Sequence, residues 1–231
     1  MTSATATAWP PASAEAAWSA GRPLPRAGHV LAVTARPGQE SADLGALLYA
    51  FRRRGASLAL LTLTRGEASP VNSTCERLEN IRPWELQVAA GLIGITLLTV
   101  ADYADGVLHR YPPAELAERI RRVIRAHAAD LLLVVEPAGA DPDDAAVARA
   151  ACTAAEQTGI PVLARMPRPA RYGWHVDLGP AAATARAVQR AAATAHASQA
   201  VTGASQAAAE HRPDHPDHRE QLRWLIPPPR G

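Results

Sequence analysis

The chain has 231 residues, 48% of them hydrophobic, and a formal net charge of +2, which suits one domain with a substantial core. All 24 basic residues are arginine, so an enzyme Schiff base, a pyridoxal anchor and a phosphate-loop lysine are excluded. The arginines are spread among acidic residues rather than clustered with aromatic ones, which argues against nucleic-acid binding.

Hydropathy and cysteine content indicate the cellular location in which we expect the protein. The longest apolar stretches, such as Leu131 to Val135, run to only a few residues, whereas a membrane-spanning helix needs roughly 20. The N-terminus has no basic start followed by an apolar run, and Cys75 and Cys152 make no disulfide framework or metal motif. We therefore expect a cytoplasmic protein without membrane contact or bound cofactor, and leave homo-oligomer formation open.

The order of predicted elements indicates the fold class. Residues 1–27 have the composition of a mobile arm, and we expect one domain over residues 28–200 and a tail over residues 201–231. Strands are expected at His29–Thr34, Ser57–Thr64, Thr96–Val100, Leu131–Val135 and Pro161–Leu163, and helices at Ala42–Arg54, Glu76–Ile93, Ala114–His127, Asp144–Gln157 and Ala181–Gln199. This alternation predicts an α/β, Rossmann-like domain, with a mainly parallel sheet covered by helices on both faces.

Three polar loops follow the predicted strands. Ligands of such sheets bind outside the carboxyl ends of the strands. That rule selects the loops Ala35–Ser41, Arg65–Thr74 and Glu136–Asp144. We expect the functional site where these loops meet.

Six short motifs occur along the chain in a fixed order. They are Ala35-Arg36-Pro37-Gly38-Gln39-Glu40, Thr64-Arg65-Gly66-Glu67, a helix with Arg82, Glu85, Ala89 and Ala90, the turn Asp105-Gly106, Asp141-Pro142-Asp143-Asp144, and His196-Ala197-Ser198-Gln199. In order and position they resemble the motifs of the LmbE/PIG-L family, the sugar and phosphatidylinositol-sugar de-N-acetylases, over roughly residues 28–199. The resemblance implies that fold and the layout of a zinc-dependent de-N-acetylase.

The chain also departs from the family's motifs. The resemblance places Arg36, Gln39 and Asp144 where the family has the histidine, aspartate and second histidine that hold zinc. It places Gly38 at the general base and Asp141 at a histidine that handles protons. A guanidinium is always protonated and has no lone pair for a metal. We therefore expect a degenerate metal site that holds no metal.

The polar residues that remain define the candidate site. The expected catalytic residues are Glu40, Asp141, Asp143 and Asp144, and the expected substrate-binding residues are Arg36, Gln39, Glu67, Arg82, Asp105 and His196. In the last group, Glu67, Arg82 and Asp105 could brace loops instead of contacting a substrate.

Several of these residues have a simpler interpretation. Glu40, the first choice for acid or base work, could instead pair with Arg36. Arg36 could be a fixed cation for a substrate or an ion-pair partner of Asp141 or Asp144. Asp143 is more simply a helix cap. His196 could face the pocket or be a buried, hydrogen-bonded histidine.

These residues favour a metal-independent acid/base enzyme of specialised metabolism that acts on an amine-containing small molecule. A Pictet–Spengler-type amine–carbonyl condensation is a concrete example, because it needs orientation and proton transfer but no metal. One alternative is a non-catalytic metabolite-binding protein or partner subunit. Another is a metal-dependent N-deacetylase or amidase with Asp141, Asp144 and His196 as replacement ligands. The tail motif His215-Pro216-Asp217-His218 is too short to indicate a metal site by itself.

Overall fold

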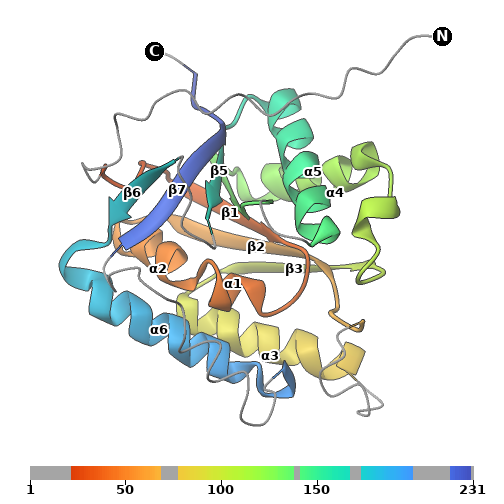
Figure 1. Cartoon of the computed structure of the whole chain (residues 1–231), viewed down its shortest axis with the longest axis horizontal. Helices are drawn as coiled ribbons and strands as arrows, with labels where there is room; N and C mark the ends of the chain where they lie inside the picture. The colour runs from red at the N-terminus through yellow and green to blue at the C-terminus, as the bar shows by residue number, and fades with distance from the viewer. Residues whose placement is uncertain (1–21, 69–77, 138–140, 167–172, 200–218, 230–231) are drawn as a thin grey trace.

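A computed structural model describes residues 22–68, 78–137, 141–166, 173–199 and 219–229. Within these residues the strands form one seven-stranded sheet in the order β3-β2-β1-β4-β5-β7-β6 (Figure 1). The strands are β1 (His29–Thr34), β2 (Ser57–Thr64), β3 (Leu97–Tyr103), β4 (Leu131–Val135), β5 (Val162–Arg165), β6 (Trp174–Asp177) and β7 (Arg219–Ile226). The first five pair in parallel, and β7 is antiparallel to both β5 and β6. The predicted α/β class with a mainly parallel sheet is confirmed.

Helices cover both faces of this sheet (Figure 1). They are α1 (Gln39–Ala42), α2 (Gly45–Arg53), α3 (Leu78–Ile93), α4 (Pro113–His127), α5 (Pro142–Thr158) and α6 (Ala182–Ala195), with 3₁₀ turns η1 (Leu108–Arg110), η2 (Gly179–Ala181) and η3 (Ala197–Gln199). Alternate strand residues point to opposite faces. Accordingly, Val30 and Ala32 pack with α2, α3 and α6, whereas Leu31 and Val33 pack with α4 and α5.

The sequence of α4 explains why it forms a helix on the sheet. It begins with Pro113, whose fixed φ suits the first helical turn. Its buried residues, Leu116, Ala117, Ile120, Val123 and Ile124, recur at helical spacing and make one apolar stripe. The helix ends at His127 and is followed by the cap residue Ala128, which adopts a left-handed φ of 52°. No helix among the described residues is long and apolar enough to cross a membrane.

The C-terminal part of the chain differs from the expectation. Residues 201–231 were expected to be a tail, but β7 lies inside the sheet between β5 and β6. Leu222 is fully buried, and Glu220 is buried between arginines that neutralise it. Leu24 of the expected N-terminal arm is also buried in the core. The sheet therefore includes sequence beyond residue 200. This strand was not predicted because its polar residues are buried against partners that the residue spacing within the strand does not reveal.

Candidate functional site

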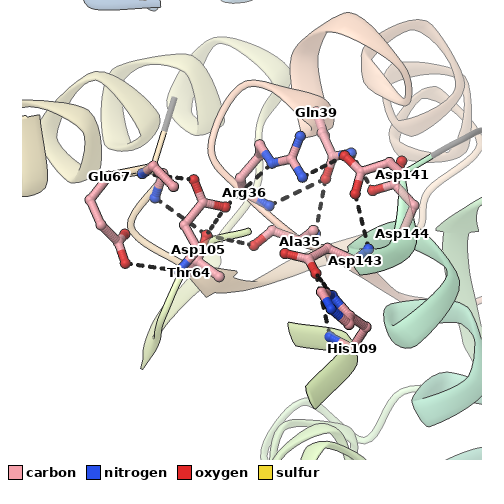
Figure 2. A network of polar contacts seen from close by, with 12 residues as sticks. Ala35, Arg36, Gln39, Thr64, Glu67, Asp105, His109, Asp141, Asp143 and Asp144 are labelled. Atoms are coloured by element: carbon pink, nitrogen blue, oxygen red, sulfur yellow. Dashed lines mark hydrogen bonds and ion pairs between the residues drawn. The ribbon is translucent and has the colours of Figure 1, made fainter. Parts of the chain in front are cut away.

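The candidate site lies at the carboxyl ends of the central strands. Because β2 and β4 flank β1 in parallel, the loops that follow β1 and β4 emerge side by side. Side chains of the first loop contact those at the start of α5 directly (Figure 2). The expected meeting of these two loops is therefore observed.

Arg36 makes the central ion pair of this site. Its Nη2 donates to Asp141 Oδ2 at 2.6 Å, and its Nε lies 3.4 Å from Asp105 Oδ1. Burial lowers the pKa of Arg36, but the hydrogen bond and charge of Asp141, with the charges of Asp105 and Asp144, outweigh burial and raise that pKa. Arg36 is thus a fixed cation, and it pairs with Asp141, one of its two expected partners.

Gln39 braces the loop and joins it to α5. Its Oε1 accepts hydrogen bonds from the backbone N–H groups of Ala35 and Arg36, at 2.9 and 3.2 Å. Its Nε2 donates to Asp144 Oδ1 at 2.7 Å. Both functional ends of the amide are therefore engaged within the protein.

The two carboxylates Asp141 and Asp144 experience opposite environments. Burial would raise the pKa of Asp141, but the hydrogen bond and charge of Arg36, with backbone hydrogen bonds, hold it below its ordinary value. For Asp144, burial raises the pKa, and the nearby charge of Asp141 adds to burial while the hydrogen bond from Gln39 opposes it. The net pKa of Asp144 is raised. The pair therefore combines a carboxylate held ionised with one that retains a proton more readily.

The cap of α5 is provided by Asp141. Its Oδ1 accepts from the backbone N–H of Asp143 at 2.9 Å. The prediction that Asp143 caps the helix with its side chain is wrong, because that side chain points to His109 instead. Asp143 Oδ1 accepts from the backbone N–H of His109 at 3.3 Å and lies within hydrogen-bond distance, 3.1 Å, of the ring Nδ1. This contact was not predicted from the sequence, because His109 lies in none of the six motifs.

Asp105 and Glu67 brace the loops beside Arg36. Asp105 accepts from the Thr64 hydroxyl at 3.2 Å and from the backbone N–H of Ala68 at 3.1 Å. Glu67 accepts from the backbone N–H of Asp105 at 2.9 Å. Arg82 is fully buried nearby, and burial lowers its pKa in spite of the surrounding carboxylates. These contacts favour loop bracing, one of the two roles expected for these residues.

Glu40 lies beneath the site instead of within it. It is 0% exposed. It accepts from the backbone N–H of Gly38 at 2.8 Å, the Ser41 hydroxyl at 2.5 Å and His196 Nε2 at 2.7 Å. Neither the expected acid/base position nor the alternative pairing with Arg36 agrees with this geometry. The first turn of α1 directs the side chain towards the end of α6, where the buried His196 meets it.

The donor set can be compared with what zinc requires. Zinc binds neutral imidazole, thiolate and carboxylate, whereas the first motif here supplies a guanidinium and an amide already bonded to the two nearest carboxylates. In the part of the chain that the structure describes, no group of three or more His, Cys, Asp or Glu residues has the arrangement of a metal site. The alternative ligand set of Asp141, Asp144 and His196 is not assembled there. His215 and His218 lie outside the described residues.

Comparison with known proteins identifies the family. Residues 31–155 match the PIG-L family, described as GlcNAc-PI de-N-acetylase, and because this match spans more than half of the chain, the chain belongs to that family. It is 31% identical over 132 residues to the probable N-acetyl-alpha-D-glucosaminyl L-malate deacetylase 2 of Bacillus anthracis, which is 54% of this chain and 58% of that protein. The chain thus matches less than two thirds of this relative's length.

Solved structures support the same fold at low sequence identity. N,N'-diacetylchitobiose deacetylase from Pyrococcus horikoshii has a TM-score of 0.71 and 15% identity, over 87% of this chain and 84% of its own. GalB, the 4-carboxy-2-hydroxymuconate hydratase of Pseudomonas putida KT2440, has a TM-score of 0.62 and 16% identity, over 88% of this chain and 98% of its own. Deacetylases and a hydratase therefore share this architecture.

Proposed function

We propose that this chain is a metal-independent acid/base enzyme that acts on an amine-containing small molecule. The observation that carries the proposal is the 2.6 Å ion pair between Arg36 and Asp141. It joins two positions that the family's motifs assign to metal binding and to proton transfer.

The donor chemistry does not fit zinc. The Arg36 cation would repel a divalent ion, and its raised pKa keeps it charged. Displacing it would leave Asp141 and Asp105 without their ion-pair partner. Without bound zinc, the site lacks the means by which metallohydrolases lower the pKa of water to about 7. Hydrolysis of an N-acetyl group by the family's route is therefore disfavoured.

The charge of the site suits an amine. Three carboxylates, Asp105, Asp141 and Asp144, act on the guanidinium of Arg36, and Asp105 also acts, together with Glu67 and Glu85, on the guanidinium of Arg82. The excess of negative charge attracts an ammonium group and favours its charged form. A neutral N-acetylated analogue gains nothing from this field. The site therefore favours the free amine over the amide.

Asp141 and Asp144 suit the proton transfers of an amine–carbonyl condensation. Groups whose environments push their pKa values apart mark acid and base roles, and here Asp144 has the raised pKa while Asp141 has the lowered one. The amine nitrogen adds to the carbonyl carbon, and the oxygen leaves as water after it gains two protons, one of which the attacking nitrogen releases. Asp144 supplies a proton to that oxygen. In a Pictet–Spengler-type reaction, ring closure then releases an aromatic proton, which Asp144 takes back.

The fold allows such a departure from deacetylation. A fold does not determine one chemistry, and GalB is a hydratase on this architecture. The paired state of Arg36 and Gln39 also favours a second candidate, a non-catalytic protein that binds an amine metabolite. Both candidates share amine recognition, and turnover separates them.

The test uses the full chain with tryptamine and phenylacetaldehyde as probes. Tryptamine should bind more tightly than N-acetyltryptamine in calorimetry, and mass spectrometry should detect the cyclised product. Asp144→Asn should lower kcat by about 10²-fold or more, the usual range for acid–base catalysis. The control, Asp102→Asn, changes a carboxylate whose side chain is 76% exposed and pairs with Arg65, and should behave as wild type.

Each outcome bears on one candidate. Tighter binding of tryptamine without turnover would support the binding protein. Release of acetate from N-acetyltryptamine would contradict the proposal and restore the hydrolase.

A further inference from the structure

His109 is held in place by a buried carboxylate although it lies in none of the sequence motifs. It belongs to η1, which follows the Asp105-Gly106 turn, and its ring Nδ1 lies 3.1 Å from Asp143 Oδ1. The backbone N–H of His109 donates to the same oxygen at 3.3 Å. Two contacts from one residue fix both the position of η1 and the orientation of the ring.

The side chain of Asp143 is buried and contacts His109. The residue is 0% exposed, and its Oδ2 is buried without a hydrogen-bond partner among the described residues. A buried carboxylate is costly unless it is paired, and among the described residues both polar contacts of its side chain are with His109. The backbone N–H of Asp143 is bonded to Asp141, so the side chain is anchored in the same turn as the candidate acid/base residues.

This contact determines which ring nitrogen of His109 is reactive. A carboxylate in its ionised form only accepts hydrogen bonds, so the 3.1 Å contact with Asp143 favours the ring tautomer that has its proton on Nδ1 and its lone pair on Nε2. Nε2 bonds to no other residue in the described part of the chain, and the side chain is 33% exposed. A buried aspartate that orients a histidine through Nδ1 is the arrangement in which Nε2 acts as a general base and the aspartate stabilises the imidazolium.

His109 and Asp143 lie next to the candidate site. Asp141, Asp143 and Asp144 all lie at the start of α5, and Asp141 contacts both Arg36 and the backbone of Asp143. Figure 2 shows Asp143 between the Ala35 segment and the His109 ring. An amine bound by the carboxylates would thus lie at the same end of the sheet as His109.

We infer that His109, oriented by Asp143, is a second proton-transfer group of this site. The inference rests on the proposed function, in which an ammonium group must lose a proton before its nitrogen can attack a carbonyl. His109 Nε2 takes that proton and becomes an imidazolium, which Asp143 stabilises. The freed lone pair of the amine then forms the bond to the carbonyl carbon. Asp144 remains the acid that protonates the departing oxygen, and the imidazolium of His109 returns its proton to the amine of the product.

The first arm of the test needs no substrate. Diethyl pyrocarbonate acylates an imidazole nitrogen that carries a lone pair, and the absence of lysine from the sequence removes a major competing reaction. Modification of His109 is followed by mass spectrometry of peptides cut after arginine. We expect acylation to be fast in wild type and slower in Asp143→Asn, with His29 as the internal reference. Equal rates in the two proteins would overturn the inference.

The second arm measures kcat against pH with tryptamine and phenylacetaldehyde. His109→Gln should lower kcat by about 10²-fold or more and remove the acidic limb of the profile, while His29→Gln should match wild type. If Asp144→Asn is slow but His109→Gln has wild-type kcat, the inference fails and the proposed function stands. If His109→Gln is slow and Asp144→Asn is not, the acid role of Asp144 fails and the His109 inference stands. If wild type has no turnover, the acylation arm decides.

Discussion

Arg36 Nη2 lies 2.6 Å from Asp141 Oδ2, and this contact joins the loop after β1 to the first turn of α5. The ion pair holds together two segments that are 105 residues apart in sequence. It also sets the charge of both partners, because Asp141 raises the pKa of Arg36 against burial and Arg36 lowers that of Asp141.

Replacing Arg36 should change stability in a pH-dependent way. The folded pKa of Asp141 is depressed, so its ionisation stabilises the fold above its unfolded pKa, about 3.9, and this contribution is lost as pH falls through the folded pKa. Arg36→Met removes the cause of the depression. The melting temperature should therefore drop at pH 7 and converge towards wild type in acid. Arg65→Met, which breaks an exposed ion pair, is the control and should have little effect at either pH.

Asp144 should show the opposite sign. Burial raises its folded pKa, so stability is greatest below its unfolded pKa and is lost as pH rises through the folded pKa. Asp144→Asn keeps an oxygen that accepts from Gln39 but removes the charge. The variant should melt above wild type at pH 7, and the difference should shrink at pH 4. A melting temperature below wild type at pH 7 would show that the Asp144 charge is well compensated.

Glu40→Gln should destabilise the protein before it affects any chemistry. The buried carboxylate takes part in three hydrogen bonds. In glutamine an NH₂ group replaces one of the two oxygens, and this group cannot accept a hydrogen bond. We expect a loss of roughly 1–3 kcal/mol in the free energy of unfolding, the cost of a buried unsatisfied group, measured by urea denaturation. Glu67→Gln alters an exposed residue that accepts one backbone hydrogen bond and should cost much less. Equal stabilities would contradict the bracing role of Glu40.

The buried charges of β7 should be essential to its place in the sheet. Glu220 is 2% exposed and pairs with Arg165 at 3.0 Å and Arg186 at 2.5 Å. Removing one member of a buried ion pair costs about 3–5 kcal/mol, because the partner is left uncompensated. Glu220→Gln should therefore unfold at much lower urea concentration than wild type. Glu118→Gln, which disrupts a surface cluster on α4, should stay near wild type.

The sequence predicted the part of the fold in which apolar periodicity determines structure. From β1 to β5 each strand is a short apolar run, and each long helix has an apolar stripe, so their order was predictable. Strands β6 and β7 were not predicted, and for β7 the reason is that Glu220 and Gln221 are polar yet buried. Their partners lie far away along the chain, and a pattern within one segment does not contain them.

The site was predictable in its location and less so in its contacts. Parallel neighbouring strands bring their loops together, so the meeting of Arg36 with Asp141 followed from the strand order. Glu40 is a neighbour of this loop in sequence, but the turn of α1 directs it to His196. His109 was not predicted as a site residue, because it lies 34 residues away in sequence from Asp143, which it contacts. Side-chain direction and long-range pairing are set by tertiary packing.

The metal content of the purified chain tests the central claim most directly. Protein made without a histidine tag would be analysed by inductively coupled plasma mass spectrometry, and its melting temperature measured with and without a chelator. Because Arg36 and Gln39 are bonded to the carboxylates at this site, we expect far less than one zinc ion per chain and an unchanged melting temperature. One tightly bound zinc ion per chain, with a lower melting temperature after chelation and loss of the metal in Asp144→Asn, would contradict the account.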